Sequence, residues 1–487
     1  MDEIWRIIFL ASTTTLLLLA LYPLYNIFLH PLRKYPGPTL WAATRLPWCW
    51  HQFHGQLHHE ILHLHEKYGK IVRVAPNELS FTSGSAWKAI YGPRPDEMSK
   101  DPVFSLLTPT GVQNILTADR ATHTRQRRLL SHAFSENALR EQHDIIEGYV
   151  DQLMEQLSLR SSRPVNIVAW LTYTVYDILR DLSFGEHFTC LDNGKADLFV
   201  SSIPAISKEL TFIQIFRFYG VDKIRRLFMP KSISGARAQN MARVVETVTR
   251  RTERNTDRKD FLHYILAAME TDKGMSREEM EVNAFSFSIA GSESSSTTLS
   301  AFTFYICTHP DVYNTLVTEI RETFASEKEI VLSAVANLPY LNAVQNEVLR
   351  IHPPVAITLP RVTPAAGAII DNCFVPGGTT VGVNHFAAYH DSRNFHCPND
   401  FLPERWTGSD PVFEKDEKES FQPFSFGPRN CLGRNLAWAE LRLITARLLY
   451  RFDLNMIGCE KWDDQKIWGF WVKEPLWVEL HNRDGCI

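Results

Sequence analysis

The sequence predicts a mainly α-helical protein with small β-sheets, consisting of one large domain behind an N-terminal transmembrane helix. Apolar residues recur at helical spacing through most of the chain, whereas strand-like runs are short and few. No internal repeat, low-complexity tract or long Gly/Ser linker interrupts the 487 residues. Although this length alone would allow about three domains, we therefore expect a single large domain over residues 39–487.

The composition excludes several classes of protein. Hydrophobic residues make up 45% of the chain and charged residues 22%, as in an ordinary globular protein. A formal net charge of -4 gives no electrostatic reason to expect a nucleic-acid partner. The 8 cysteines occur without CxxC pairs or zinc-type spacing. We therefore expect neither a disulfide framework nor a zinc finger, and a reducing compartment fits best.

Residues 1–30 are predicted to form a membrane anchor. The segment IIFLASTTTLLLLALYPLYNIFL, residues 7–29, carries no charge, and roughly 20 apolar residues suffice to cross a bilayer as a helix. A cleaved signal peptide would begin with basic residues, but two acidic residues stand at positions 2 and 3, so we favour a retained anchor. Arg33 and Lys34 follow the span and indicate that the rest of the chain faces the cytosol.

Beyond the anchor, residues 31–38 end in the sequence YPGP and are predicted to form a stiff, non-helical hinge. Apolar periodicity then predicts helices over residues 53–68, 119–140, 141–158, 165–183, 276–308, 310–326, 339–351 and 433–451. The helix near 276 has a clear start, because Ser276 and Glu279 match a capping box. Strands are predicted in KIVRVAPNELSF, as a hairpin around residues 76–77, and after the turn at residues 377–378.

The segment FSFGPRNCLG is the strongest chemical signal, because it sets Cys431 among glycines directly before a helix. No second Cys or His lies at zinc-ligand spacing, and nothing local supports a nucleophilic thiol, although 18 histidines leave a distant base open. A thiolate ligand of haem iron needs a chain that passes close to a flat macrocycle, which Gly427 and Gly433 permit. Phe424 is placed to shield the sulfur, and Arg429 is suited to a haem carboxylate. The helix that begins near Gly433 directs its N-terminal dipole toward an anionic ligand.

This pattern, F-x-x-G-x-R-x-C-x-G, resembles the haem-binding loop of the cytochrome P450 family. The resemblance covers essentially residues 30–480 and is most like fungal microsomal members of secondary metabolism, such as trichothecene hydroxylases. It implies the cytochrome P450 fold, heme b with its iron bound by the Cys431 thiolate, and residence in the endoplasmic reticulum membrane with a cytosolic catalytic domain.

Two further motifs follow in the order that the family requires. Glu347 and Arg350 in NEVLRIHPP share a helix face, and the segment PERW at 403–406 resembles the family's P-E-R-F. The resemblance implies that Arg405 joins this pair in a buried network that braces the cysteine loop. We interpret Trp406 as a tolerated replacement for phenylalanine. The role of this network would be structural.

Contacts to the haem propionates are also implied. His123 and Arg127 stand at i,i+4 and resemble the family's W-x-x-x-R, with His in place of Trp, while Arg361 resembles the propionate arginine that follows the E-x-x-R helix. The alternative is that HTRQRRLL is a basic, solvated helix face. Arg125 or Arg128 would then meet the negative surface of a reductase.

The catalytic helix is predicted in FSIAGSESSSTT, which matches the family's A/G-G-x-D/E-T as Ala290, Gly291, Glu293 and Ser294, with serine where threonine is usual. By the resemblance, Gly291 leaves room for dioxygen, Glu293 relays protons inward and the Ser294 hydroxyl donates a proton during dioxygen activation. We expect Ser294 Oγ to bond the Ala290 carbonyl and to loosen the helix. The alternative is a helix whose polar residues simply line a polar cleft.

Together these motifs predict a monooxygenase that uses O2 to hydroxylate or epoxidise a lipophilic metabolite from the membrane, such as a terpenoid or polyketide. The chain carries no flavin or nicotinamide fingerprint, so the resemblance implies NADPH-cytochrome P450 reductase as partner. Two alternatives stay open. One is a haem-thiolate desaturase, oxidative coupling enzyme or isomerase without net oxygen insertion. The other is a non-catalytic membrane haem sensor or carrier.

Overall fold

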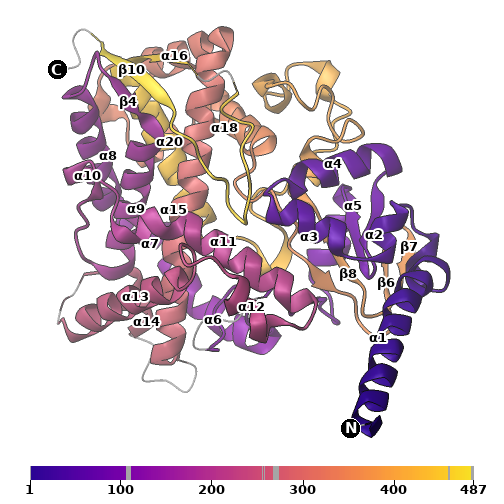
Figure 1. Cartoon of the computed structure of the whole chain (residues 1–487). Coiled ribbons are helices and arrows are strands. Elements are labelled where there is room, and N and C mark those ends of the chain that lie inside the picture. Colours follow the sequence, from indigo (N-terminus) through magenta and orange to yellow (C-terminus); the bar gives the residue numbers. More distant parts are fainter. Residues whose placement is uncertain are drawn as a thin grey trace.

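The computed structural model describes residues 2–105, 111–254, 256, 258–266, 274–458 and 461–483 (Figure 1). Helices dominate this part of the chain, and three small sheets lie among them. The mainly α-helical prediction with small β-sheets is therefore confirmed. The α-helices are α1 Asp2–Phe28, α2 Thr39–Ala43, α3 Leu46–Phe53, α4 Leu57–Tyr68, α5 Gly84–Tyr91, α6 Arg120–Ala133, α7 Glu136–Glu141, α8 His143–Ser158, α9 Ile167–Phe184, α10 Cys190–Asn193, α11 Leu198–Phe218, α12 Arg225–Phe228, α13 Ala236–Glu253, α14 Phe261–Leu266, α15 Arg277–Thr308, α16 Pro310–Thr323, α17 Leu332–Val335, α18 Pro339–Ile351, α19 His385–Tyr389 and α20 Arg434–Arg451.

Helix α15 runs through the middle of the molecule and organises the core (Figure 1). It packs against α9 on one side and against α13, α18 and α20 on others. The predicted capping box is confirmed, because the Ser276 side chain accepts from the Glu279 N–H and the Glu279 carboxylate accepts from the Ser276 N–H. The main apolar cluster joins side chains of α8, α9, α15, α16, α18 and α20.

The largest sheet has the order β1-β2-β8-β5-β3. The predicted hairpin is confirmed as β1 Ile71–Ala75 antiparallel to β2 Glu78–Phe81, and the strand after residues 377–378 is β8 Thr380–Val383. Strand β8 pairs in parallel with β2, so segments about 300 residues apart share one sheet. The other strands are β3 Ser99–Lys100, β4 Pro164–Asn166, β5 Arg361–Val362, β6 Ala368–Ile370, β7 Cys373–Val375, β9 Phe452–Met456 and β10 Trp477–Asn482.

One predicted helix is shorter in the structure and another is divided. The helix predicted over 53–68 is α4 alone, because the chain turns at Gly55, whose φ of +72° favours glycine. The helix predicted over 119–140 breaks after Ala133, since Ser135 caps a new helix, α7, by accepting from the Ala138 N–H. Helices α11 and α13 were not predicted.

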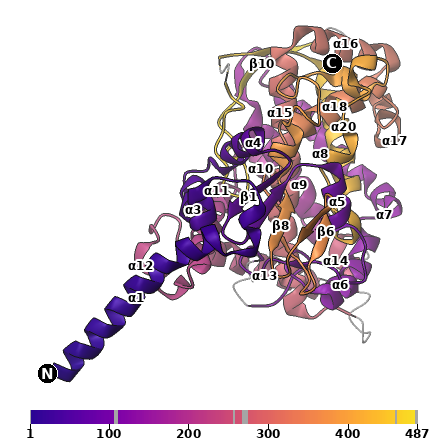
Figure 2. The same ribbon diagram turned by 90° about the vertical axis from the view of Figure 1, so that its right-hand side faces the viewer.

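Helix α1 projects away from the body of the protein (Figure 2). Its described apolar side chains, including Trp5, Phe9 and Leu10, are exposed. Its last turn is fixed to the body, because Arg73 donates from Nη1 to the Asn26 carbonyl at 2.9 Å and the Asn26 amide donates to Ala43 at 3.0 Å. The hinge predicted to be non-helical contains a short 3-10 turn, Pro31–Lys34, before it becomes extended.

By length and apolar character, α11 is the one helix in the described part of the chain that could cross a membrane. It packs against α3 and α13 within the body, however. The apolar stretch found in α1, Ile4–Thr14, is shorter than a bilayer span. The predicted N-terminal transmembrane helix therefore stays a prediction.

Candidate active site

The loop from Phe424 to Gly433 is closed by its own backbone. The Cys431 N–H donates to the Phe424 carbonyl at 2.8 Å, and the Asn430 N–H donates to the Gly427 carbonyl at 3.1 Å. Gly427 has a φ of +75°, and a Cβ there would lie 2.1 Å from the Tyr91 carbonyl oxygen. The turn therefore requires glycine. Apart from its chain neighbours, no atom of the described residues lies within 4 Å of a Cβ built at Gly433, which caps α20.

Cys431 is exposed although protein surrounds its loop. Burial raises the pKa of its thiol, whereas the Gly433 N–H, Arg127 and Arg434 act to lower it. Cys190, by contrast, is buried in a core, and burial raises its thiol pKa to about 12. Cys431 thus combines an accessible sulfur with donors and cations that favour a thiolate.

A zinc or disulfide role finds no support in the described part of the chain. There, no group of three or more His, Cys, Asp or Glu side chains is arranged to hold a metal ion. All six cysteines in this part are unpaired, and they are Cys49, Cys190, Cys307, Cys373, Cys397 and Cys431. A single protein sulfur suits the axial position of a haem iron better than a zinc site, which needs several protein ligands.

Four cations gather around His123 on α6. Burial lowers the pKa of this histidine most, and together with the charges of Arg429, Lys100, Arg127 and Arg361 it brings the pKa to about 3. The predicted propionate residues are therefore brought together, and Lys100 of β3 joins them unpredicted. No local motif marked this lysine, since its place depends on the pairing of β3 with β5.

The cations differ in their protein partners. Arg127 donates to the Asn430 carbonyl and, at 2.7 Å, to Asn430 Oδ1, which ties α6 to the cysteine loop. Arg429 contacts Glu97 and donates to the Ala118 carbonyl at 2.8 Å. Arg361 has a buried Nη1 that finds no hydrogen-bond partner among the residues that the structure describes. An orphaned guanidinium nitrogen within a cationic cluster fits the carboxylates of haem.

The alternative prediction was that the basic face of α6 is solvated, and it holds for only one of the two arginines it named. Arg125 is held by Glu279 and by the Gly274 carbonyl, so it does not present a solvated charge. Arg128 is exposed. One basic residue of this pair thus stays available to a partner protein.

Helix α15 exposes one narrow stripe beside the site. Between residues 282 and 306, Phe287, Ala290, Gly291 and Ser294 are half-buried, and the remaining positions are buried. Their i, i+3, i+4, i+7 spacing places them on one face. The expected hydrogen bond is present, since Ser294 Oγ donates to the Ala290 carbonyl at 2.7 Å. The expected loosening is not observed, because the helix continues from Arg277 to Thr308.

The structure gives a packing reason for glycine at position 291. A Cβ there would lie 2.8 Å from Cδ2 of Leu179 on α9, so the glycine permits close packing of two helices. The expectation that Gly291 leaves room for dioxygen stays a prediction.

Glu293 is buried and paired. Its Oε2 accepts from Lys473 Nζ at 2.7 Å, and both side chains are only 8% exposed. The lysine lies 180 positions later in the chain, and no local pattern predicted this contact. The polar residues of α15 therefore do not merely face a solvated cleft.

The predicted network around Glu347 is buried as expected. The side chains of Glu347, Arg350 and Arg405 are 0% exposed, with Arg350 Nη2 2.7 Å from Oε1 and Arg405 Nε 3.1 Å from Oε2 of the glutamate. Burial raises the pKa of Glu347, but the two arginines outweigh it and lower the pKa overall. Trp406 adds a donor that was not predicted, since its Nε1 lies 2.8 Å from Glu347 Oε2.

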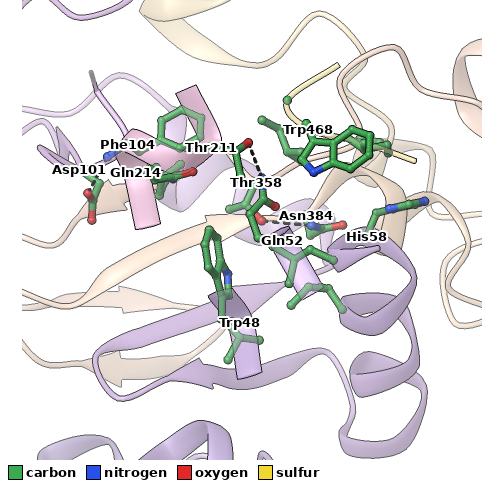
Figure 3. Close-up of a pocket in the computed structure, with 18 of the residues that line it drawn as sticks. Trp48, Gln52, His58, Asp101, Phe104, Thr211, Gln214, Thr358, Asn384 and Trp468 are labelled. Carbon is green, nitrogen blue, oxygen red and sulfur yellow. Dashed lines mark hydrogen bonds between the residues drawn. The ribbon is translucent and has the colours of Figure 1, made fainter. Parts of the chain in front are cut away.

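A cavity of about 170 Å³ lies between α3, α4, α11, the main sheet and the loop at residues 467–470 (Figure 3). Aromatic side chains of Trp48, Phe104 and Trp468 line it together with the amides of Gln52 and Gln214. Gln52 reaches Thr211 on α11 across the cavity wall, at 3.5 Å (Figure 3). Its lining thus combines aromatic and aliphatic side chains with amides, hydroxyls, a histidine and the carboxylates of Glu78 and Asp101.

Known proteins resemble the chain over almost its whole length. The sequence pattern of the family described as Cytochrome P450 matches residues 36–476. The chain is 40% identical over 482 residues to averantin hydroxylase from Dothistroma septosporum, covering 98% of this chain and 91% of that protein. It is 43% identical over 465 residues to cytochrome P450 monooxygenase atr2 from Stereocaulon alpinum, covering 94% and 92%. It is 40% identical over 471 residues to cytochrome P450 monooxygenase astJ from Aspergillus oryzae, covering 94% of each.

The matched region includes the Cys431 loop, the cationic cluster and the buried Glu347 network. Members of this family bind haem iron through a cysteine thiolate and act as monooxygenases. The chain therefore belongs to the Cytochrome P450 family and is a haem-thiolate monooxygenase.

Proposed function

We propose that this chain inserts one oxygen atom from O2 into an unactivated C–H or C=C bond of a lipophilic secondary metabolite, a terpenoid or polyketide. The single observation that carries this proposal is the exposed thiol of Cys431, held in a self-closed loop beside a cluster of cations. When bound, haem supplies the activation of dioxygen.

The residues that would hold haem come from three parts of the chain. Cys431 would hold the iron through its thiolate, in the loop that Phe424, Gly427 and Gly433 shape. His123, Arg127, Arg361 and Arg429 would hold the two carboxylates. The unpartnered Nη1 of Arg361 supports this assignment, because a buried guanidinium nitrogen without an acceptor is costly until a carboxylate reaches it.

Proton supply is assigned to α15. Glu293 takes up protons from water, and Ser294 presents its hydroxyl on the half-buried stripe that also holds Ala290 and Gly291. The Ser294 hydrogen bond to Ala290 fixes the rotamer of the side chain, which offsets the loss of the threonine methyl.

The substrate proposal rests on the cavity. A volume of about 170 Å³ is close to that of a site that holds one benzene-sized ring, roughly 150 Å³. Aromatic walls with the amides of Gln52 and Gln214 suit a flat ring that carries oxygen substituents, because the amides provide both donors and acceptors. We therefore favour aromatic polyketides over saturated terpenoids. The named relative averantin hydroxylase supports an origin in fungal secondary metabolism.

Membrane attachment is proposed for two elements. Helix α1 serves as a single-pass anchor in the endoplasmic reticulum, with the catalytic domain on the cytosolic face. A second apolar surface lies where α3 meets the end of α11, and its exposed residues are Leu46, Trp50, Phe53, Tyr219, Val221, Leu227 and Phe228. This surface supports docking of the body onto the bilayer, because monomeric soluble proteins rarely expose large contiguous apolar patches. NADPH-cytochrome P450 reductase, itself a membrane protein, then supplies electrons at the side of the cysteine loop.

The test is oxygen insertion under 18O2. Membranes that contain this chain, the reductase and NADPH are incubated with aromatic polyketides and terpenoids of similar size, and products are weighed by mass spectrometry. We expect one 18O atom per hydroxylated or epoxidised product. Unlabelled dehydrogenated, coupled or rearranged products would support the alternative without net oxygen insertion. NADPH consumption that no candidate substrate stimulates would support a haem sensor. Cys431→Ala is the control, since it removes the thiolate signature from the carbon monoxide difference spectrum.

A further inference from the structure

Lys473 lies against α15 with all of its polar contacts on one face of that helix. Its Nζ is 2.7 Å from Glu293 Oε2, 3.0 Å from Ser296 Oγ and 3.4 Å from Thr297 Oγ1. The three donors of an ammonium group are thereby directed at α15. Because both charged side chains are only 8% exposed, water cannot replace this contact at low cost.

A buried ion pair contributes little net stability, since removing two charges from water offsets most of their attraction. The role of the ion pair is therefore sought in its effect on the Glu293 carboxylate. Without a cation the buried carboxylate would take up a proton or turn toward water. With Lys473 in place, one of its oxygens is fixed by a contact of 2.7 Å to the ammonium group.

We propose that Lys473 is a positioning residue that pairs with the Glu293 carboxylate and holds it in one orientation between rounds of proton transfer. In each round Glu293 takes a proton from water and passes it toward Ser294, after which the carboxylate returns to its contact with Lys473. This inference rests on the proposed function of Glu293.

The loop that carries Lys473 also contributes side chains to the cavity wall. Trp468 and Phe470 of the same loop line the cavity. The loop is fastened by Trp471, whose Nε1 donates to the Pro353 carbonyl at 2.8 Å, and by the Val472 N–H, which donates to the Lys466 carbonyl at 2.9 Å. The side chain that fixes the carboxylate and the side chains that contact a ligand in the cavity therefore share one short, anchored segment.

The test compares Lys473→Met with Lys473→Arg in the full-length, haem-loaded protein. Lys466→Met is the matched control, because Lys466 is an exposed lysine of the same loop. The first readout needs no turnover: infrared difference spectra at neutral pH are searched for the carbonyl band of a protonated carboxylic acid. We expect Lys473→Met to gain this band, and the double variant Lys473→Met with Glu293→Gln to lack it. Lys473→Arg and Lys466→Met should resemble the unaltered protein.

The second readout is product formed per NADPH consumed. Because general acid–base groups contribute factors of about 10² to 10⁴, we expect Lys473→Met to lower this ratio about tenfold, with arginine restoring most of it. The substrate-induced shift of the haem absorption band should keep its midpoint, since Lys473 does not line the cavity.

The outcomes separate the two proposals. If Lys473→Met gains no carboxylic acid band and couples NADPH to product normally while Glu293→Gln does not, the role of Lys473 is overturned and that of Glu293 stands. If neither variant changes the coupling, the proposed role of Glu293 fails and the inference fails with it. If Lys473→Met does not fold, Lys473→Arg is compared directly with the unaltered protein. A folded Lys473→Arg protein that forms much less product per NADPH consumed overturns the charge-based role.

Discussion

Gly427 of the cysteine loop lies against the main chain of Tyr91, the last residue of α5, so closely that a Cβ would be 2.1 Å from the Tyr91 carbonyl oxygen. The neighbouring atoms are backbone, which cannot turn aside as a side chain can. The loop that presents Cys431 is therefore held by α5 as well as by its own hydrogen bonds. Because of this contact, a side chain at Gly427 should disturb the loop more than a side chain at Gly433.

We expect Gly427→Ala to abolish haem binding, whereas Gly433→Ala leaves the protein fold intact. The first change combines a strained φ of +75° with a backbone clash, and the second meets no protein atom within 4 Å. Thermal unfolding and the ratio of haem absorbance to protein absorbance measure both effects. Equal retention of haem by the two variants would contradict the proposed role of the Tyr91 contact.

Trp406→Phe should destabilise the protein even though it restores the usual residue of the family motif. The indole Nε1 of the half-buried Trp406 donates to the buried Glu347 carboxylate at 2.8 Å, and hydrogen bonds to charged groups contribute about 1.5–3 kcal/mol. We expect the free energy of unfolding in urea to fall by about 1–2 kcal/mol, because two arginines still satisfy the carboxylate. Trp477→Phe, at an exposed indole, is the control and should change it by less than about 0.5 kcal/mol.

Acid should weaken the fold through a group of buried histidines. Burial lowers the pKa of His58 to about 2 and that of His352 and His390 to about 3. The unfolded chain binds protons near pH 6.5, so stability is complete above this pH and is lost as pH falls toward about 3. At pH 5.5 each histidine should lower the free energy of unfolding by about 1.4 kcal/mol relative to its value at high pH.

His352→Phe isolates one of these histidines, since a phenyl ring preserves the stacking on Trp471, whose ring centroid lies 4.0 Å away. We expect urea unfolding between pH 7.5 and 5.5 to lose about 1.4 kcal/mol less in this variant than in the unaltered protein. His63→Gln, at an exposed histidine, should leave the pH dependence unchanged. Identical pH slopes for His352→Phe and the unaltered protein would refute the assignment.

Glu440 of α20 should act in the opposite direction. Burial raises the pKa of its carboxyl to about 8, against a minor lowering by Ser295, and its Oε1 has no partner. Between pH 4.5 and 8 the unfolded chain is ionised while the folded site keeps its proton, so stability falls as pH rises. We expect Glu440→Gln to raise the melting temperature, and to raise it more at pH 7.5 than at pH 5. A gain that is the same at both values would show that the carboxyl does not titrate on unfolding.

Several features could be predicted because their signals are local. The capping box at Ser276 and Glu279, the turn geometry of the Cys431 loop and the i,i+3 pair of Glu347 and Arg350 each lie within ten residues. Helix α13 was not predicted because the polar residues Asn240, Thr247 and Arg251 lie on its buried face and interrupt the apolar pattern. Helix α11 was not predicted because it carries Pro204 in its interior, and an interior proline usually indicates that a helix ends.

Short-range spacing and the chemistry of a thiolate among glycines were enough to predict the helical class, the cysteine loop and the residue types expected to hold haem. Which distant groups lie beside these residues depends on the tertiary structure. It brought Lys473 to Glu293 across 180 positions, gathered Lys100 beside His123, and turned Gly291 toward Leu179. The physical reason is that such contacts follow from how helices and strands pack, and packing depends on the whole set of buried surfaces rather than on any one segment.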